Sequence, residues 1–165
     1  MVKALFIGGI KSGKSFLAEQ YTLKHAKSKP FYLATTEFID TEMQERIEAH
    51  KLQRQESFTT LEEPLKLCQA IEPTDDIILV ECVSMWINNM LYHKQNYDAI
   101  KKEIRTICSL EKEIVFVLND VGSGIIPDNA LAREFVDISG KISQLLAQEC
   151  DEVFHVIAGI GSKIK

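Results

Sequence analysis

Apolar residues along the chain fall into short continuous runs that are rich in β-branched and aromatic side chains. These runs lie at residues 4–7, 31–34, 77–80, 114–118 and 153–158. Polar residues do not alternate with apolar ones inside the runs, and continuous apolar strands are typical of a parallel sheet that is covered on both faces. The pattern therefore predicts strands of an open α/β fold.

Segments with helical spacing lie between these runs. Residues 41–44 have the form of a capping box, which predicts a helix that continues to about residue 54. Further helices are expected over 83–92 and from about 97 to 109. Strands that alternate with helices predict right-handed crossovers and ligands at the carboxyl ends of the strands. The clearest apolar stripe, which we expect to pack on the sheet, consists of Leu131, Phe135, Ile138, Ile142 and Leu145.

The first predicted strand leads directly into a glycine-rich segment. Residues 8–15 read Gly-Gly-Ile-Lys-Ser-Gly-Lys-Ser and match the phosphate-binding pattern GxxxxGK[ST] in full. Glycines let backbone N–H groups turn toward phosphate oxygens, and the start of the following helix adds positive potential. We expect Lys14 to neutralise the β- and γ-phosphates of a purine nucleoside triphosphate and Ser15 to ligate Mg²⁺. A dinucleotide fingerprint is excluded, because Ile10 occupies the position of its second glycine.

Two further features follow predicted strands. Glu81 comes directly after the strand at 77–80, so it is either a second ligand for the metal or a surface carboxylate. Residues 119–129 form a loop longer than the usual connection of roughly two to six residues, which favours a substrate-contacting loop over a simple turn. Arg133 could reach an anionic substrate or pair with Asp137.

His50 lies in the predicted helix at 41–54, with Arg46 one turn before it and Arg54 one turn after it. A histidine among apolar helix positions is most often a packed core residue. Two nearby guanidinium groups, however, disfavour a charged imidazole and can bind phosphate. His50 is therefore a candidate nucleophile toward phosphorus. Structural roles are expected for the remaining histidines, His25, His93 and His155.

Composition and charge remove several classes of function. The 165 residues fit one catalytic domain, residues 1–165, and a net charge of -5 gives no general attraction for nucleic acid or anionic lipid. The four cysteines form no CxxC pair, which argues against zinc and disulfides and fits a reduced cytosol. No apolar stretch approaches about 18 residues, and no signal peptide pattern is present. We expect a cytoplasmic enzyme without a membrane span or a nucleic-acid partner.

Five segments of the chain follow the pattern of a known family, in order and over nearly the whole length. They are IGGIKSGKS, FYLATTEFIDTEMQERIEAHKLQR, ILVECVSMWINNML, LNDVGSGIIPDNALAREFVDISGKISQLLA and the terminal DEVFHVIAGIGSKIK. Together they resemble bacterial bifunctional adenosylcobinamide kinase/adenosylcobinamide-phosphate guanylyltransferase. The histidine helix and the NDVGSGIIP loop are far more specific to this family than the phosphate loop alone.

The resemblance implies a P-loop NTPase with a RecA-like, mostly parallel sheet flanked by helices. It implies that adenosylcobinamide is phosphorylated with ATP or GTP, and that GMP then passes from GTP to the phosphate through a GMP-histidine intermediate on His50. Ser15 and Glu81 would hold Mg²⁺, and the assembly would be a homo-oligomer, which is a trimer in many members. The family's nucleotide contacts carry over to Gly8, Gly9, Ile10, Lys11, Ser12, Gly13, Lys14, Ser15, Ala34, Thr35, Thr36, Lys51, Leu52, Gln53, Arg54, Glu62 and Glu81.

Two alternatives stay open from the sequence. One is a P-loop small-molecule kinase without guanylyltransferase activity, in which His50 only packs or binds. The other is a non-catalytic GTP-binding paralogue that uses the nucleotide as a switch.

Overall fold

The computed structural model describes residues 1–37, 41–54 and 56–165, without the side chains of residues 42, 43, 46, 47, 50 and 53. Within these residues seven strands form one sheet in the order β3-β2-β4-β5-β1-β6-β7. Neighbouring strands are parallel except β6 and β7, which are antiparallel. The strands are β1 (Lys3–Gly8), β2 (Phe31–Ala34), β3 (Thr59–Glu62), β4 (Ile78–Glu81), β5 (Ile114–Asn119), β6 (Glu152–Ile157) and β7 (Ile160–Lys163).

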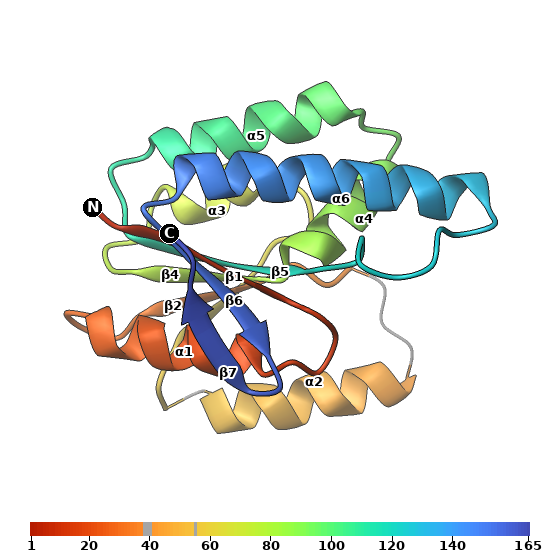
Figure 1. Ribbon diagram of the computed structural model, residues 1–165. Helices are drawn as coiled ribbons and strands as arrows, with labels where there is room; N and C mark the ends of the chain where they lie inside the picture. The colour runs from red at the N-terminus through yellow and green to blue at the C-terminus, as the bar shows by residue number, and fades with distance from the viewer. Residues whose placement is uncertain (38–40, 55) are drawn as a thin grey trace.

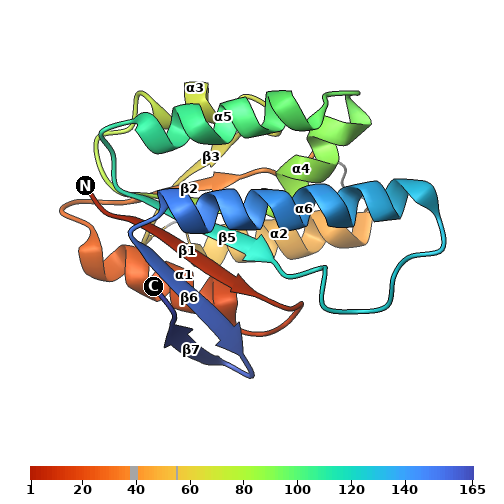
Figure 2. The same cartoon turned by 45° about the horizontal axis from the view of Figure 1, so that its top comes forward.

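Helices cover both faces of the sheet (Figure 1). Those described are α1 (Lys14–His25), α2 (Thr41–Arg54), α3 (Leu67–Ile71), α4 (Val83–Tyr92), α5 (Tyr97–Ser109) and α6 (Ala130–Glu149). In Figures 1 and 2, α1 and α2 lie on one side of the sheet, and α3, α4, α5 and α6 lie on the other. Among the described residues, no helix combines the length and the apolar character needed to cross a bilayer.

The two layers of helices explain why the strands read as continuous apolar runs. In β1, Ala4 and Phe6 belong to the core on the α1 side, whereas Leu5 belongs to the core under α3 to α6. Successive side chains of a strand point to opposite faces, so both parities must be apolar when both faces are covered. The α/β fold class predicted from the sequence is confirmed.

The sequence pattern located the strands and helices that pack at the centre, and it missed three peripheral elements. It did not predict β3, α3 or β7; β3 contains two threonines and a glutamate, α3 has five residues, and every residue of β7 is exposed. The prediction for Leu131 was also wrong. Its side chain is 69% exposed, because the first turn of α6 extends beyond the edge of the sheet (Figure 1).

Candidate active site

The phosphate loop joins β1 to α1, and close backbone contacts fix its shape. A Cβ atom on Gly8 would lie 2.3 Å from the carbonyl oxygen of Val156, so only glycine fits between β1 and β6. Gly13 has a φ of +93°, in the left-handed region that favours glycine. The N–H of Gly159, in the turn between β6 and β7, donates to the carbonyl of Ser12 at 2.7 Å. The β6–β7 turn therefore braces the loop from one side.

The polar side chains at the start of α1 meet the end of β4. Lys14 is buried, and its Nζ donates to the carbonyl of Gly9 at 3.0 Å. Ser15 Oγ donates to Glu81 Oε1 at 2.8 Å. Burial raises the pKa of Glu81 to about 7, although the Ser15 hydrogen bond and the charge of Lys14 lower it. Glu81 Oε2 is buried and has no hydrogen-bond partner among the described residues.

This arrangement fits a magnesium ion that is shared with a nucleotide. Mg²⁺ prefers oxygen ligands and is usually bound through one or two carboxylates together with substrate phosphates. Ser15 offers a hydroxyl, and Glu81 offers a buried carboxylate oxygen to which no described residue donates a hydrogen bond. No group of three His, Cys, Asp or Glu side chains gathers into a metal site in the part of the chain that is described. Phosphates of the nucleotide and water can supply the remaining ligands.

A cavity of about 510 Å³ opens at the carboxyl edge of the sheet. Its volume falls in the range of roughly 300–1,000 Å³ that is usual for ligand pockets. The last residues of four strands line it, so the ends of β2, β3, β4 and β5 meet there. Among its walls are six of the residues that the sequence assigned to the nucleotide: Ala34, Thr36, Lys51, Arg54, Glu62 and Glu81.

Charged groups gather at the end of the cavity that β3 and α2 form. Lys51 of α2 makes an ion pair with Glu62 at the end of β3. The guanidinium carbon of Arg54 lies 3.9 Å from the ring centroid of Tyr32, within the usual range of a cation–π contact. Both cations and the carboxylate line the cavity. This end can therefore bind phosphate oxygens and also accept hydrogen bonds from a base.

Three other residues assigned to the nucleotide are exposed and do not line the cavity. Ile10 and Leu52 are 81% and 68% exposed, and neither lines the cavity. Lys11 is exposed on the phosphate loop. The side chains of His50 and Gln53 lie outside the part of the molecule that the structure describes, so both assignments stay predictions.

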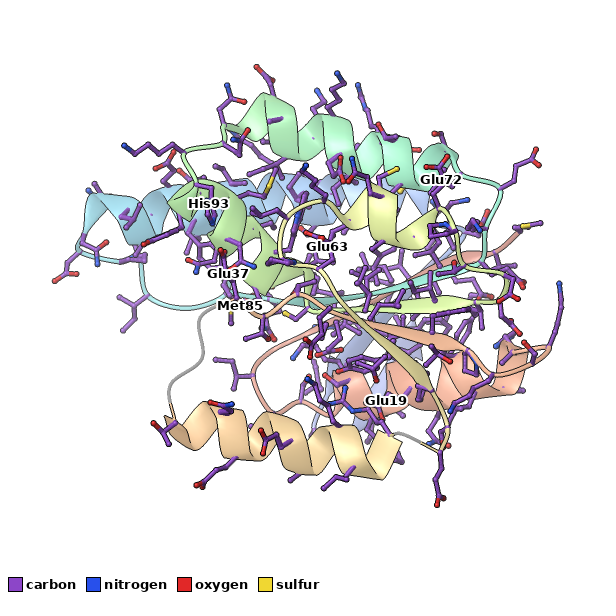
Figure 3. The ribbon with its side chains drawn as sticks, turned by 180° about the vertical axis from the view of Figure 1, so that it is seen from behind. Glu19, Glu37, Glu63, Glu72, Met85 and His93 are labelled. Atoms are coloured by element: carbon purple, nitrogen blue, oxygen red, sulfur yellow. The ribbon has the colours of Figure 1, made fainter. Side chains whose placement is uncertain are left out.

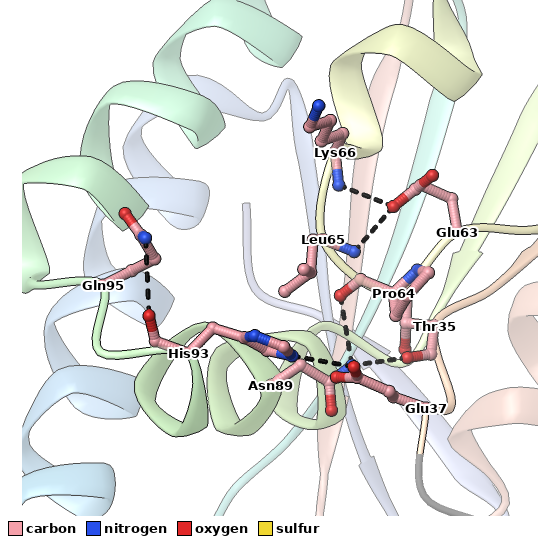
Figure 4. Close-up of polar contacts among 9 residues, drawn as sticks. All are labelled: Thr35, Glu37, Glu63, Pro64, Leu65, Lys66, Asn89, His93 and Gln95. Atoms are coloured by element: carbon pink, nitrogen blue, oxygen red, sulfur yellow. Dashed lines mark hydrogen bonds and ion pairs between the residues drawn. The ribbon is translucent and has the colours of Figure 1, made fainter.

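Sequence reasoning missed Asn89, a buried residue of α4 that holds two loops at the cavity (Figure 4). Its Nδ2 donates to the carbonyl of Thr35 at 2.6 Å and to the carbonyl of Pro64 at 3.1 Å. Thr35 and Pro64 belong to the loops that follow β2 and β3. A buried amide must find hydrogen-bond partners, so an asparagine among apolar helix residues was the signal available in the sequence.

Two other side chains, one in α4 and one directly after it, contact these loops. Trp86 Nε1 donates to the carbonyl of Leu65 at 2.9 Å. His93 Nε2 lies 2.7 Å from Glu37 Oε1, and Figure 3 shows the two side chains close together. The loops that present Thr36 and Glu62 are thus fastened to α4 over two helical turns. The contact of His93 agrees with the structural role expected for it.

The long loop after β5 contributes to the cavity, as its length suggested. Asn119 and Val121 line the wall opposite α2. Arg133 does not make the predicted pair with Asp137, because its Nη1 donates to the carbonyls of Pro127 and Asp128 at 2.9 and 2.8 Å, and its contact with an anionic substrate stays a prediction. The chain turns sharply just before α6 and brings those carbonyls within reach of the guanidinium. Arg133 therefore shapes the end of the loop.

Comparisons with known proteins agree with this site. The model of the family described as cobinamide kinase / cobinamide phosphate guanyltransferase matches residues 4–164. The chain is 36% identical to the bifunctional adenosylcobalamin biosynthesis protein CobU of Escherichia coli K12 and 37% identical to that of Salmonella typhimurium LT2, in each case over 98% of both chains. It is 32% identical to the bifunctional adenosylcobalamin biosynthesis protein CobP of Pseudomonas aeruginosa PAO1, over 99% of this chain and 98% of that protein.

A solved structure supports the fold alone. The flagellar accessory protein FlaH from Methanocaldococcus jannaschii superposes with a TM-score of 0.51 at 13% sequence identity, over 98% of this chain and 75% of that chain. The phosphate loop, the carboxylate at the end of β4 and the full-length sequence matches lead to one conclusion: the chain belongs to the cobinamide kinase / cobinamide phosphate guanyltransferase family.

Proposed function

We propose that this protein phosphorylates adenosylcobinamide with ATP or GTP and then transfers GMP from GTP to the resulting phosphate through a GMP-histidine on His50. The observation that carries the proposal is the single cavity that joins Glu81, beside the phosphate loop, to Lys51 and Arg54 at the end of α2. A simple kinase or a non-catalytic paralogue is not favoured, because the three relatives named above are all bifunctional proteins matched over nearly their full length.

The phosphate loop binds the triphosphate. Its backbone N–H groups and the start of α1 face the phosphate oxygens, and Lys14 exchanges its bond to the Gly9 carbonyl for a bond to phosphate. Ser15 and Glu81 would hold Mg²⁺, which neutralises phosphate charge when bound.

The opposite end of the cavity selects the base and the α-phosphate. The carboxylate of Glu62 can accept hydrogen bonds from the ring N–H and the neighbouring amino group of guanine. Adenine does not present this pair of donors. Lys51 holds that carboxylate in place through its ion pair. Arg54 supplies guanidinium N–H donors to the phosphate, and it is kept in position over the ring of Tyr32.

The position of His50 in α2 supports its assignment as the nucleophile of a two-step transfer. It immediately precedes Lys51 and lies one helical turn before Arg54, and both of these residues line the cavity. In the proposed first step an imidazole nitrogen attacks the α-phosphorus and pyrophosphate leaves. A phosphate oxygen of the acceptor then attacks the same phosphorus, and the P–N bond breaks. A covalent intermediate lets each partner approach in line in its own step.

Product analysis tests both activities together. The protein is incubated with adenosylcobinamide and with GTP that carries its label at the γ or the α position. We expect γ label to enter adenosylcobinamide phosphate first, and α label to enter the guanylylated product later. Incorporation of γ label without α label would support a simple kinase, and no incorporation at all would support a non-catalytic paralogue.

A further inference from the structure

A second cavity of about 590 Å³ lies next to the nucleotide cavity, between the end of α4 and the start of α6. We call it the α4–α6 groove. Asn88 and Phe135 line both cavities, so the two spaces share a wall. Tyr92 of α4 and Leu131 of α6 line the groove but not the nucleotide cavity. The groove therefore leads from the surface to the nucleotide cavity.

Two large apolar side chains in the walls of the groove are mostly exposed. Tyr92 and Leu131 are 65% and 69% exposed. In the loop that leads into α6, Ile125 and Ile126 are 97% and 80% exposed. Contiguous exposed apolar side chains mark binding sites on proteins. The amide of Asn88 lines the groove together with Tyr92 and Leu131, so the groove fits a ligand that combines methyl groups with carboxamides.

The strand order places the groove on the β5 side of the reacting phosphates, opposite the side where the base is expected. Strand β4, which carries Glu81, lies between β2 and β5 in the sheet. Lys51 and Glu62, which are assigned to the nucleotide, line the cavity on the β2 and β3 side. On the other side of Glu81 the cavity is lined by Asn119 at the end of β5 and by Asn88. A second substrate can thus reach the phosphates from the β5 side without displacing the base.

We infer that the α4–α6 groove binds the corrinoid acceptor, an inference that rests on the proposed function. The methyl-rich edge of the macrocycle packs on Tyr92 and Leu131, and its carboxamide side chains meet Asn88. The aminopropanol arm then extends past Phe135 toward the phosphates. The alcohol and the phosphorylated alcohol carry the same macrocycle, so one groove serves both acceptors.

Two variants on opposite walls test the groove. Leu131→Glu and Tyr92→Ala change exposed side chains, and a negative charge in the first turn of α6 is compatible with the helix N-terminus. Ile164→Glu, at a side chain that is 66% exposed near the carboxyl terminus, is the matched control. Loss of apolar contact should raise KM for adenosylcobinamide by about tenfold in each groove variant, with KM for GTP unchanged. Covalent labelling by GTP without acceptor should also stay at the wild-type level, and the control should match the wild type.

A wild-type KM for adenosylcobinamide in both groove variants would overturn the proposal, as would a parallel rise in KM for GTP. Light scattering on the same variants detects a changed molecular mass; such a change with an unaltered acceptor KM would assign the surface to a contact between subunits. If the wild type forms no covalent GMP, only the guanylyl step of the proposed function fails, and the kinase KM still tests the groove. If there is no turnover at all, equilibrium dialysis decides: the groove requires that wild type binds adenosylcobinamide and that both variants bind it about tenfold more weakly.

Discussion

Replacing Glu81 by glutamine removes a carboxylate whose charged form is disfavoured by burial. The pKa of this carboxyl rises from 4.5 to about 7 in the folded protein. The folded state therefore binds the proton more tightly than the unfolded state does, and this contributes stability that is fully present below pH 4.5. That stability is lost as the pH rises through about 7. Glutamine does not titrate, and its side-chain oxygen can still accept the hydrogen bond from Ser15 Oγ.

The size of the effect follows from the two pKa values. Each pH unit between them corresponds to about 1.4 kcal/mol, so the interval from 4.5 to about 7 corresponds to about 3 kcal/mol. Roughly 2.5 kcal/mol of this falls between pH 5 and pH 8. Any pH-independent cost of burying the amide cancels when the two proteins are compared at the two pH values.

Urea unfolding measures this difference, and Trp86 is a natural probe because it is the single tryptophan of the chain and is fully buried. The free energy of unfolding of Glu81→Gln relative to wild type should rise by about 2.5 kcal/mol from pH 5 to pH 8. Kinase activity should be lost in the same variant. An equal difference at both pH values would refute the reasoning, because it would mean that the carboxyl titrates alike in the folded and unfolded states.

Three further variants test the phosphate loop and the loops that Asn89 holds. Lys14→Ala should abolish both activities in the labelled-GTP assay, because one loop serves both nucleotide reactions; retained guanylylation would indicate two sites. Asn89→Ala should lower the free energy of urea unfolding by about 2 kcal/mol through two lost hydrogen bonds, and it should raise KM for GTP more than it lowers kcat; unchanged stability would mean that Asn89 does not hold the two loops. Gly8→Ala should destabilise the fold by about 1–3 kcal/mol and weaken GTP binding in equilibrium dialysis, since its Cβ would lie 2.3 Å from the Val156 carbonyl; tolerance of alanine would argue against the close approach.

The central part of the fold could be predicted because its strands are buried on both faces. The run at the end of β5, Phe116 to Leu118, is apolar at every position since alternate residues face different layers of helices. The edge strands β3 and β7 carry no such pattern. They form by pairing with β2 and β6, and context of this kind decides strand formation more than local sequence does.

In the candidate site, too, some residues could be predicted from the local sequence and others depend on packing between distant segments. The phosphate loop and Glu81 could be placed from the sequence, because each directly follows a buried strand whose carboxyl end meets the ligand edge. Asn89 could not be linked to Thr35, which lies 54 residues away, since that bond depends on how α4 packs against the loops. The carbonyl contacts of Arg133 depend likewise on the turn before α6, which the local sequence left open.

The central claim is that an imidazole in α2 takes GMP from a triphosphate held by the phosphate loop. The most direct measurement incubates the protein with α-labelled GTP in the absence of acceptor and maps the labelled peptide. The account predicts acid-labile GMP on His50 and an unlabelled His50→Ala variant. An unlabelled wild type, label on the neighbouring Lys51, or label retained by His50→Ala would contradict it.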